Sequence, residues 1–158
     1  MALFGLSPSP TVNDPILGTL TRSRGFWRGR VMLGDADLPL LIAGGNEAPD
    51  VMALALAREL PVRYLALQDL IGPALFEHYE PYADTSDDGD FAEQPPRIPD
   101  AAGVWPQVTP LQVTIAPLAG RLSIEIAYTT RWDVEHTLGA IIADWRLIDL
   151  NGSILLRR

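Results

Sequence analysis

Residues 122–129 read Leu-Ser-Ile-Glu-Ile-Ala-Tyr-Thr, which is the clearest strand pattern in the chain. A large apolar residue occupies every second position from Leu122 to Tyr128, and smaller or polar residues lie between them. Successive side chains of a strand point to opposite faces of a sheet. The alternation therefore predicts a β-strand with one buried face and one wetter face.

Further strands are predicted on both sides of this segment. Residues 111–115 alternate in the same way, and residues 138–150 indicate one longer or bulged strand because the apolar parity shifts within them. The dipeptide at 151–152 is Asn-Gly, which is typical of a two-residue hairpin turn. It predicts a last strand over residues 153–156.

The N-terminal part of the chain also favours strands. Residues 7–15 contain three prolines and indicate an extended lead-in. Residues 16–22 and 26–33 flank the short connection Ser23-Arg24-Gly25 and predict a hairpin. Residues 38–43 predict a third strand, and the proline within it favours a strand start or a sheet edge.

Two helices are predicted in the middle of the chain. The first begins after Asn46 or Asp50, either of which is a plausible N-cap, and Pro61 ends it. The second covers residues 67–78, where apolar residues recur at intervals of three and four. Gly72-Pro73 predicts a kink or a restart in this second helix.

The order of these elements predicts one α+β domain over residues 1–158. Strands grouped before and after the helices favour a largely antiparallel sheet, with three N-terminal and four C-terminal strands packed with the two central helices. The chain has 158 residues, of which 47% are hydrophobic. This length is enough for a core without disulfides or structural metal. The chain has no cysteine, so disulfides are excluded.

Charge is concentrated in one segment, residues 84–103. The chain has a net charge of -8, and this segment holds six acids and one arginine, hence five of those negative charges. We expect a mobile acidic surface loop. A negative protein is a poor binder of nucleic acid and of anionic membranes but attracts a basic protein by electrostatic steering. Within the loop, the candidate binding residues are Asp87, Asp88 and Asp90.

The location is expected to be cytoplasmic. The first residues lack the positive region and the long apolar run of a signal peptide. No stretch of the chain approaches the roughly 18 apolar residues of a membrane span.

The densest polar cluster is residues 131–137, between two predicted strands. Asp133, Glu135 and His136 are able to act as metal ligands or as an acid/base pair. The same residues also suit a structural role, in which Asp133 caps a turn and Trp132 closes the core. A second cluster, residues 77–82, contains the only other histidine, so the two clusters could together form a two-histidine site.

Residues 132–139 read Trp-Asp-Val-Glu-His-Thr-Leu-Gly. This octapeptide resembles the W-D-x-E-H-x-x-G signature of a loose group of uncharacterised bacterial α+β domains. Some members of that group are regarded as immunity proteins of polymorphic toxin systems. The resemblance implies a protein partner, and it brings no established catalytic residues to this chain.

Three functional hypotheses follow. The first is a non-catalytic binding protein, of immunity type, whose partner is a basic toxin or effector and whose binding residues are Trp132, Asp133, Glu135, His136 and the loop acids. The second is a metal-dependent or acid/base enzyme that uses the Asp133, Glu135 and His136 loop. The third is an assembly module that self-associates through the exposed edge of residues 38–43. The first hypothesis requires no cofactor, and the sequence does not indicate the oligomeric state.

Overall fold

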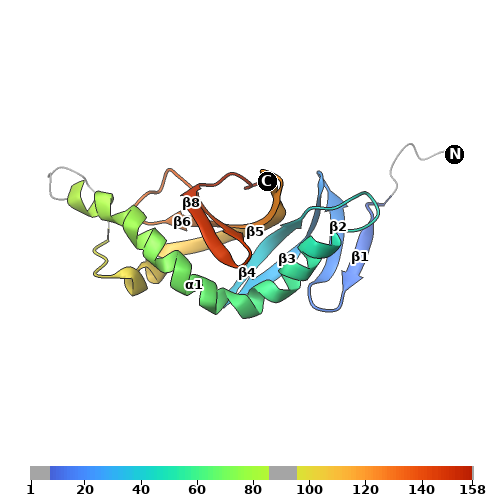
Figure 1. Ribbon diagram of the computed structural model, residues 1–158, viewed down its shortest axis with the longest axis horizontal. Helices are drawn as coiled ribbons and strands as arrows, with labels where there is room; N and C mark the ends of the chain where they lie inside the picture. The colour runs from blue at the N-terminus through green and yellow to red at the C-terminus, as the bar shows by residue number, and fades with distance from the viewer. Residues whose placement is uncertain (1–7, 86–95, 158) are drawn as a thin grey trace.

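Eight strands form a single sheet in which each strand lies beside its neighbours in the sequence, and a long helix lies along one face (Figure 1). The computed structural model describes residues 8–85 and 96–157. The fold class predicted from the sequence, α+β with a largely antiparallel sheet, is confirmed. The elements are β1 (Thr11–Asp14), β2 (Gly18–Ser23), β3 (Phe26–Leu33), β4 (Ala36–Ile42), α1 (Val51–Thr85), the 3-10 helix η2 (Ala101–Gln107), β5 (Val108–Leu118), β6 (Arg121–Thr130), β7 (Leu138–Ala143) and β8 (Arg146–Gly152).

Two-residue turns with positive φ connect several of the strands. Arg24 and Gly25 join β2 to β3 with φ of 51° and 85°, which confirms the predicted hairpin. Asp144 and Trp145, with φ of 51° and 58°, make the same kind of turn between β7 and β8. Such turns match the twist of antiparallel strands. The prediction of one strand over residues 138–150 is therefore wrong, because this turn contains no glycine or asparagine to reveal it.

The C-terminal hairpin predicted from Asn-Gly is also wrong. Asn151 and Gly152 are the last residues of β8 and pair with Gly139 and Leu138 of β7. Residues 153–156 form no strand and instead fold onto the sheet. The positive-φ preference of Asn-Gly indicates a turn only where the next segment pairs back, and here the next segment bonds to a side chain.

The sheet consists of two four-stranded meanders that meet at β4 and β5. These two strands are parallel, with Leu40–Ile42 opposite Val113–Ile115, and all other neighbours are antiparallel. Residues 38–43 therefore lie in the middle of the sheet, and the prediction that they form an edge is wrong. The edges are β8 and β1, and β1 lies within residues 7–15, which were expected to be a lead-in without a strand.

A single helix of 35 residues replaces the two predicted helices. It contains Pro61, Pro73 and Pro81, and it bends as it passes along the sheet (Figure 1). A proline inside a helix costs roughly 3 kcal/mol. Burial of one large apolar side chain contributes about 1.5–3 kcal/mol, and the helix buries a continuous stripe of them. The stripe consists of Ala53, Ala57, Leu60, Tyr64, Leu67, Ile71, Leu75 and Tyr79.

The start of α1 is set by Asp50. Its Oδ1 accepts a hydrogen bond from the backbone N–H of Ala53 at 2.8 Å, so Asp50, and not Asn46, is the N-cap. Arg58, two turns further, donates to the buried carboxylate of Asp14 with 2.8 Å between Arg58 Nε and Asp14 Oδ1. This contact fixes the start of the helix to the turn between β1 and β2.

Both faces of β6 are buried, although its pattern predicted a wetter face. Glu125, which belongs to that polar face, is only 1% exposed. Its carboxylate accepts hydrogen bonds from Ser153 Oγ and from the backbone N–H groups of Ile154 and Leu155. Gly139 of β7 leaves the necessary space, since a Cβ there would be 2.6 Å from Glu125 Oε2. The C-terminal segment thus covers the back of the sheet.

Replacement of Glu125 by alanine should therefore release the C-terminal segment. We expect the free energy of unfolding, measured with urea, to fall by about 3 kcal/mol, because buried donors lose a charged acceptor. Hydrogen exchange at the amides of Ile154 and Leu155 should accelerate. The exposed Glu47 provides a control, and Glu47→Ala should change the free energy by less than about 0.5 kcal/mol. A loss at Glu125 as small as the control's, with unchanged exchange, would contradict this role.

Candidate functional site

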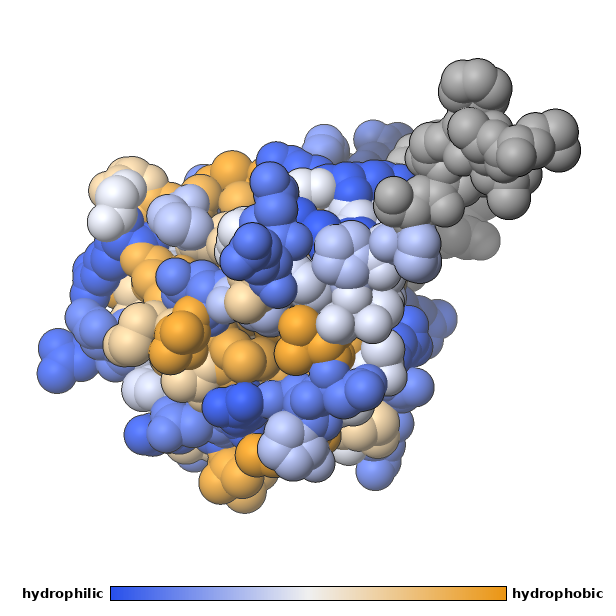
Figure 2. Space-filling view, turned by 90° about the vertical axis from the view of Figure 1, so that its right-hand side faces the viewer, coloured by the Kyte–Doolittle hydropathy of each residue, from blue (hydrophilic) through white to orange (hydrophobic). Residues whose placement is uncertain are grey.

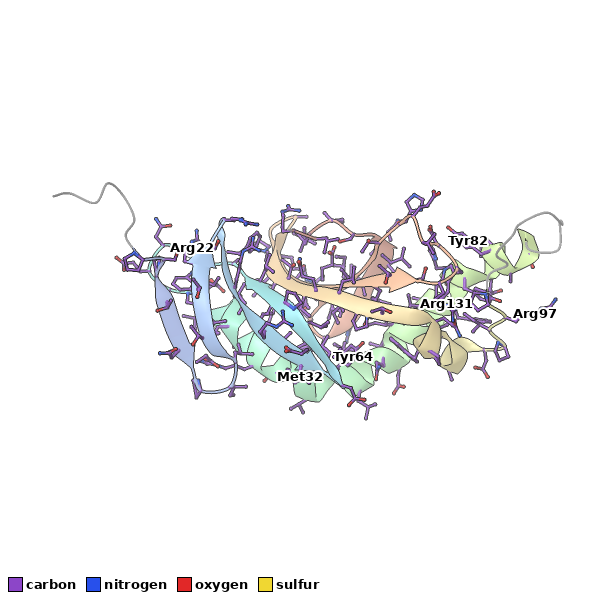
Figure 3. All side chains as sticks on the ribbon, turned by 180° about the vertical axis from the view of Figure 1, so that it is seen from behind. Arg22, Met32, Tyr64, Tyr82, Arg97 and Arg131 are labelled. Atoms are coloured by element: carbon purple, nitrogen blue, oxygen red, sulfur yellow. The ribbon has the colours of Figure 1, made fainter. Side chains whose placement is uncertain are left out.

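The loop between β6 and β7 meets the C-terminal half of α1 at one end of the molecule. Figure 3 shows Tyr82 of α1 and Arg131 of the loop at this end. The two polar clusters of the sequence, residues 131–137 and residues 77–82, are therefore neighbours in space, as their composite site would require. We call the contact between them the loop–helix junction.

Asp133 is the centre of the loop–helix junction. It is 8% exposed, and its carboxylate accepts hydrogen bonds from Tyr82 Oη at 2.7 Å and from His136 Nδ1 at 2.9 Å. Its backbone N–H donates to Thr130 Oγ1 at 3.2 Å. The carboxylate thus orients an imidazole within its own loop and attaches the loop to the helix.

An aromatic cluster supports the same contact. Trp132 Nε1 donates to His78 Nδ1 at 3.0 Å, so a neutral His78 carries its proton on Nε2. The His78 ring stacks on Tyr82 with 5.6 Å between centroids, and Tyr79 meets Trp132 edge to face at 5.5 Å. Trp132 is buried, as the structural interpretation of the motif predicted. His78 Nδ1 therefore already accepts a hydrogen bond from the indole N–H of Trp132.

The pKa values of the two histidines are shifted in opposite directions. Burial lowers the pKa of His78, the charge of Asp133 opposes this shift, and His136 adds to it. The hydrogen bond and charge of Asp133 raise the pKa of His136. Burial raises the pKa of Asp133, but the hydrogen bonds from Tyr82 and His136 outweigh it, so the net shift is downward.

The remaining predicted site residues are less enclosed. The Glu135 side chain is exposed, and its charge helps to raise the pKa values of Tyr82 and His136, while its backbone N–H helps to lower the pKa of Asp133. In residues 8–85 and 96–157, no three side chains of His, Asp or Glu converge as metal ligands. Asp87, Asp88 and Asp90 lie outside the described residues. At the ends of the predicted loop 84–103, residues 84–85 belong to α1 and residues 101–103 belong to η2.

An acidic face of α1 was missed by the sequence analysis. Asp69, Glu77, Glu80 and Asp84 are all exposed, and their spacing places them within one side of the helix. No described arginine or histidine forms an ion pair with any of them. The spacing was readable from the sequence, but it has meaning only if the helix continues through Pro73 and Pro81.

Apolar side chains are exposed at the opposite end of the molecule. Figure 2 shows them in the middle of the face at which β1 lies, bordered by charged and polar residues. Ile16, in the turn after β1, is 64% exposed, and Val51 and Met52, at the start of α1, are 78% and 66% exposed. Exposed apolar groups that gather in one place are typical of interaction surfaces.

These features define an α+β domain whose loop–helix junction fixes one end of a long acidic helix to its sheet. The chain belongs to the family described as "Domain of unknown function (DUF6985)", whose model matches residues 16–153. No curated protein and no solved structure matches the chain. No helix in the described part of the chain combines the length and the apolar character that a membrane crossing requires.

The loop–helix junction predicts separate titrations for the two histidines. In an NMR titration, His78 should titrate below the ordinary imidazole pKa of about 6.5 and His136 above it. Asp133→Asn should bring His136 back toward the ordinary value, because the charge that raises its pKa is gone. Asp37→Asn, in which the lost carboxylate pairs with Arg30, is the control and should leave both histidines unchanged. Equal titration of both rings in the native protein would contradict the geometry.

The same shifts predict how stability depends on pH. Asp133 has a lowered pKa, so its contribution is present above pH 3.8 and is lost as the pH falls through the folded value. His136 has a raised pKa, so its contribution is present below pH 6.5 and is lost as the pH rises through the folded value. The free energy of unfolding, measured with urea from pH 3 to 9, should fall less at both ends of this range in Asp133→Asn than in the native protein. Unaltered pH dependence in this variant would be inconsistent with the junction.

Proposed function

We propose that this protein is a non-catalytic binding domain that captures a basic protein in the cytoplasm, and that the acidic face of α1 is its docking surface. The observation that carries the proposal is the placement of the four exposed carboxylates of that face, Asp69, Glu77, Glu80 and Asp84, along the second half of one helix. The two arginines of α1, Arg58 and Arg63, both lie in its first half.

Glu77, Glu80 and Asp84 are unfavourable for the free protein, because like charges three and four residues apart on a helix repel one another, and Asp84 also lies in the last turn. The C-terminal end of a helix carries partial negative charge, so a nearby carboxylate destabilises the helix by about 0.3–1 kcal/mol. The last turn of α1 has no basic residue to compensate. Arg97 and Arg131 lie at the same end of the molecule (Figure 3). Neither forms an ion pair with a described acid of this face, and Arg131 donates to Gln107 instead. A cationic partner would relieve this repulsion, so the acidic face favours binding of such a partner.

The class of partner follows from charge and from the resemblance of residues 132–139. An immunity-type protein masks a toxin, and many charge-complementary complexes form through electrostatic steering. Asp87, Asp88 and Asp90 follow α1 in the sequence and extend its acidic composition. We therefore propose a basic toxin or effector as the partner, and neither a nucleic acid nor a membrane.

The docking surface predicts a selective effect of charge reversal. The variant Glu80→Lys/Asp84→Lys should lose a basic protein that the native protein retains from a lysate of its source, identified by mass spectrometry. The matched control is Asp35→Lys/Glu47→Lys, which reverses two exposed acids outside α1. Each replacement changes the charge by two, so both variants have the same net charge.

The control should retain the partner, and 0.5 M salt should weaken retention because the attraction is electrostatic. Two results would contradict the proposal. One is equal retention by all three proteins. The other is retention of no basic protein at all, by the native protein or by the control.

The acidic face also predicts a stabilised variant. Glu80→Lys should raise the free energy of unfolding by a few tenths of a kcal/mol to about 1 kcal/mol at low salt, because the repulsion with Glu77 and Asp84 is replaced by attraction at spacings of three and four residues. Thermal unfolding at 20 mM and 500 mM salt measures this, and the gain should shrink at the higher concentration. Glu47→Lys, outside the helix, is the control. Destabilisation by Glu80→Lys would show that Glu80 serves the fold.

An acid/base enzyme is the alternative, and one observation favours it. The side chain of His136 is 69% exposed while the buried carboxylate of Asp133 holds its Nδ1. That is the geometry of an oriented general base. Turnover of p-nitrophenyl esters or phosphodiesters that rises with pH and disappears in His136→Gln would replace the binding proposal with this one.

A further inference from the structure

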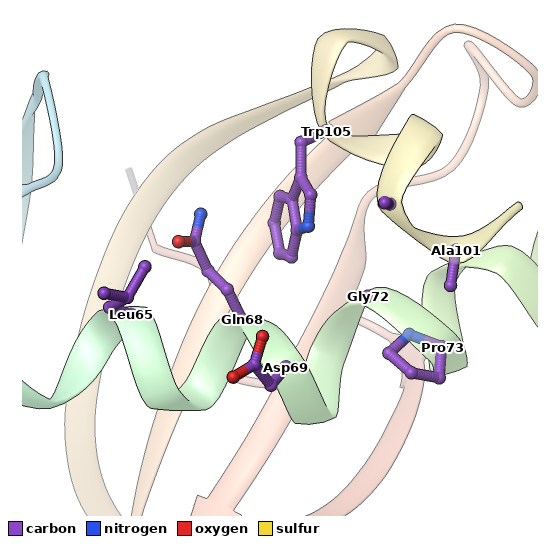
Figure 4. A pocket seen from close by; sticks show the side chains of 8 residues that line it. Leu65, Gln68, Asp69, Gly72, Pro73, Ala101 and Trp105 are labelled. Atoms are coloured by element: carbon purple, nitrogen blue, oxygen red, sulfur yellow. The ribbon is translucent and has the colours of Figure 1, made fainter.

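We infer that the groove between α1 and η2 is a pocket for an arginine side chain of the partner. The inference deepens the proposed function and rests on it, because it supplies a specific anchor beside the acidic face of α1. Figure 4 shows the groove, with Trp105 of η2 standing over the helix between Gln68 and Gly72. Its volume is about 410 Å³, and its lining includes Leu65, Gln68, Asp69, Gly72 and Trp105.

Trp105 is held in place from two sides. Asp100 caps η2 by accepting a hydrogen bond from the N–H of Gly103 at 3.0 Å. The buried ring of Tyr128 meets Trp105 edge to face, with 6.1 Å between centroids. Gly72 permits the close approach of the indole, since a Cβ on Gly72 would lie 3.3 Å from Trp105 Nε1. The ring is therefore fixed before any ligand arrives.

The indole N–H of Trp105 has no acceptor among the described residues. Two other tryptophans show what a committed indole looks like, because Trp27 Nε1 donates to the carbonyl of Gly45 and Trp132 Nε1 donates to His78. Trp105 is only partly buried, so its N–H is accessible from the groove. The groove thus presents one hydrogen-bond donor that has no partner in residues 8–85 and 96–157.

Asp69 supplies a negative charge on the same wall. Its side chain is exposed, and no described residue forms an ion pair or hydrogen bond with its carboxylate. The lining contains no arginine or histidine to neutralise it. Anions are therefore disfavoured in this groove, and a cation is favoured.

The ligand must match an apolar wall, a carboxylate and a free indole donor. An arginine in a peptide has all three complements. Its methylene stem packs along Leu65 and Trp105, its guanidinium binds Asp69 in a bidentate geometry, and its backbone carbonyl accepts from the indole N–H. Arginine is preferred to lysine, because its planar, weakly hydrated head stacks on aromatic rings and forms paired hydrogen bonds.

NMR spectroscopy of the indole N–H groups tests this assignment with a defined probe. The chain has four tryptophans, hence four indole signals, and Trp105→Phe identifies the relevant one. The probe is N-acetyl-arginine N-methylamide, and its neutral isostere is N-acetyl-citrulline N-methylamide. The arginine compound should shift the Trp105 signal saturably at millimolar concentration. The citrulline compound should bind at least severalfold more weakly, because it lacks the charge that pairs with Asp69.

Variants locate the interaction. Asp69→Asn should weaken arginine binding severalfold, as expected for an ion pair at an exposed carboxylate, whereas Asp149→Asn, at an exposed acid of β8, should leave it unchanged. Equal binding of the two compounds, or no shift of Trp105 by either, would overturn the assignment. This outcome is distinguishable from failure of the proposed function. The capture experiment reverses Glu80 and Asp84, which do not line the groove, and it needs no arginine site.

Discussion

The packing of α1 against the sheet is the contact on which the rest of the structure depends. One stripe of the helix is buried from Ala53 to Tyr79, and it covers strands from both meanders. In the middle of this stripe, Tyr64 hydrogen-bonds Tyr128 of β6 with 2.9 Å between the hydroxyl oxygens. The helix is also the connection between β4 and β5, and a parallel pair requires a crossover of this kind. Without it the two meanders would have only the short pairing of β4 with β5.

The ends of the helix are fixed by polar contacts of different chemistry. At the start, Arg58 donates to the buried Asp14, whose pKa is lowered because hydrogen bonds from Arg58, Leu17 and Ile16 outweigh the effect of burial. At the other end, the loop–helix junction joins Tyr82 to Asp133. With its inner stripe buried and both ends held, the helix has one remaining side for function. That side carries the acidic face and the wall of the groove beside Trp105.

Much of the fold could be predicted from the sequence, because alternation of apolar residues reports strands directly. The segments at 26–33 and 122–129 and the turn at Arg24-Gly25 are examples. The helix could not be predicted as one element. Pro61 and Pro73 are strong local stop signals, and the burial that outweighs them comes from strands distant in the sequence. The turn at Asp144-Trp145 was missed for a related reason, since two residues without turn preference take positive φ there under the constraint of β7 and β8.

The candidate site was predictable only in part. The motif at 132–136 and the cluster at 77–82 were recognised, and they do lie together, but their hydrogen bonds are visible only in three dimensions. The acidic face depended on helix continuity, and the role of Trp105 depended on the position of η2 over Gly72. Asp87, Asp88 and Asp90 keep their sequence-based interpretation.

The buried stripe and the acidic face share one helix axis only if α1 continues through its prolines. The most direct measurement is the set of backbone ¹³Cα chemical shifts of residues 51–85 in solution. We expect helical shifts without interruption, including at Leu60 and Gly72, which precede prolines. Extended-chain values at either of these positions would contradict this continuity. The carboxylates of the second half would then lie on a separate helix with its own axis.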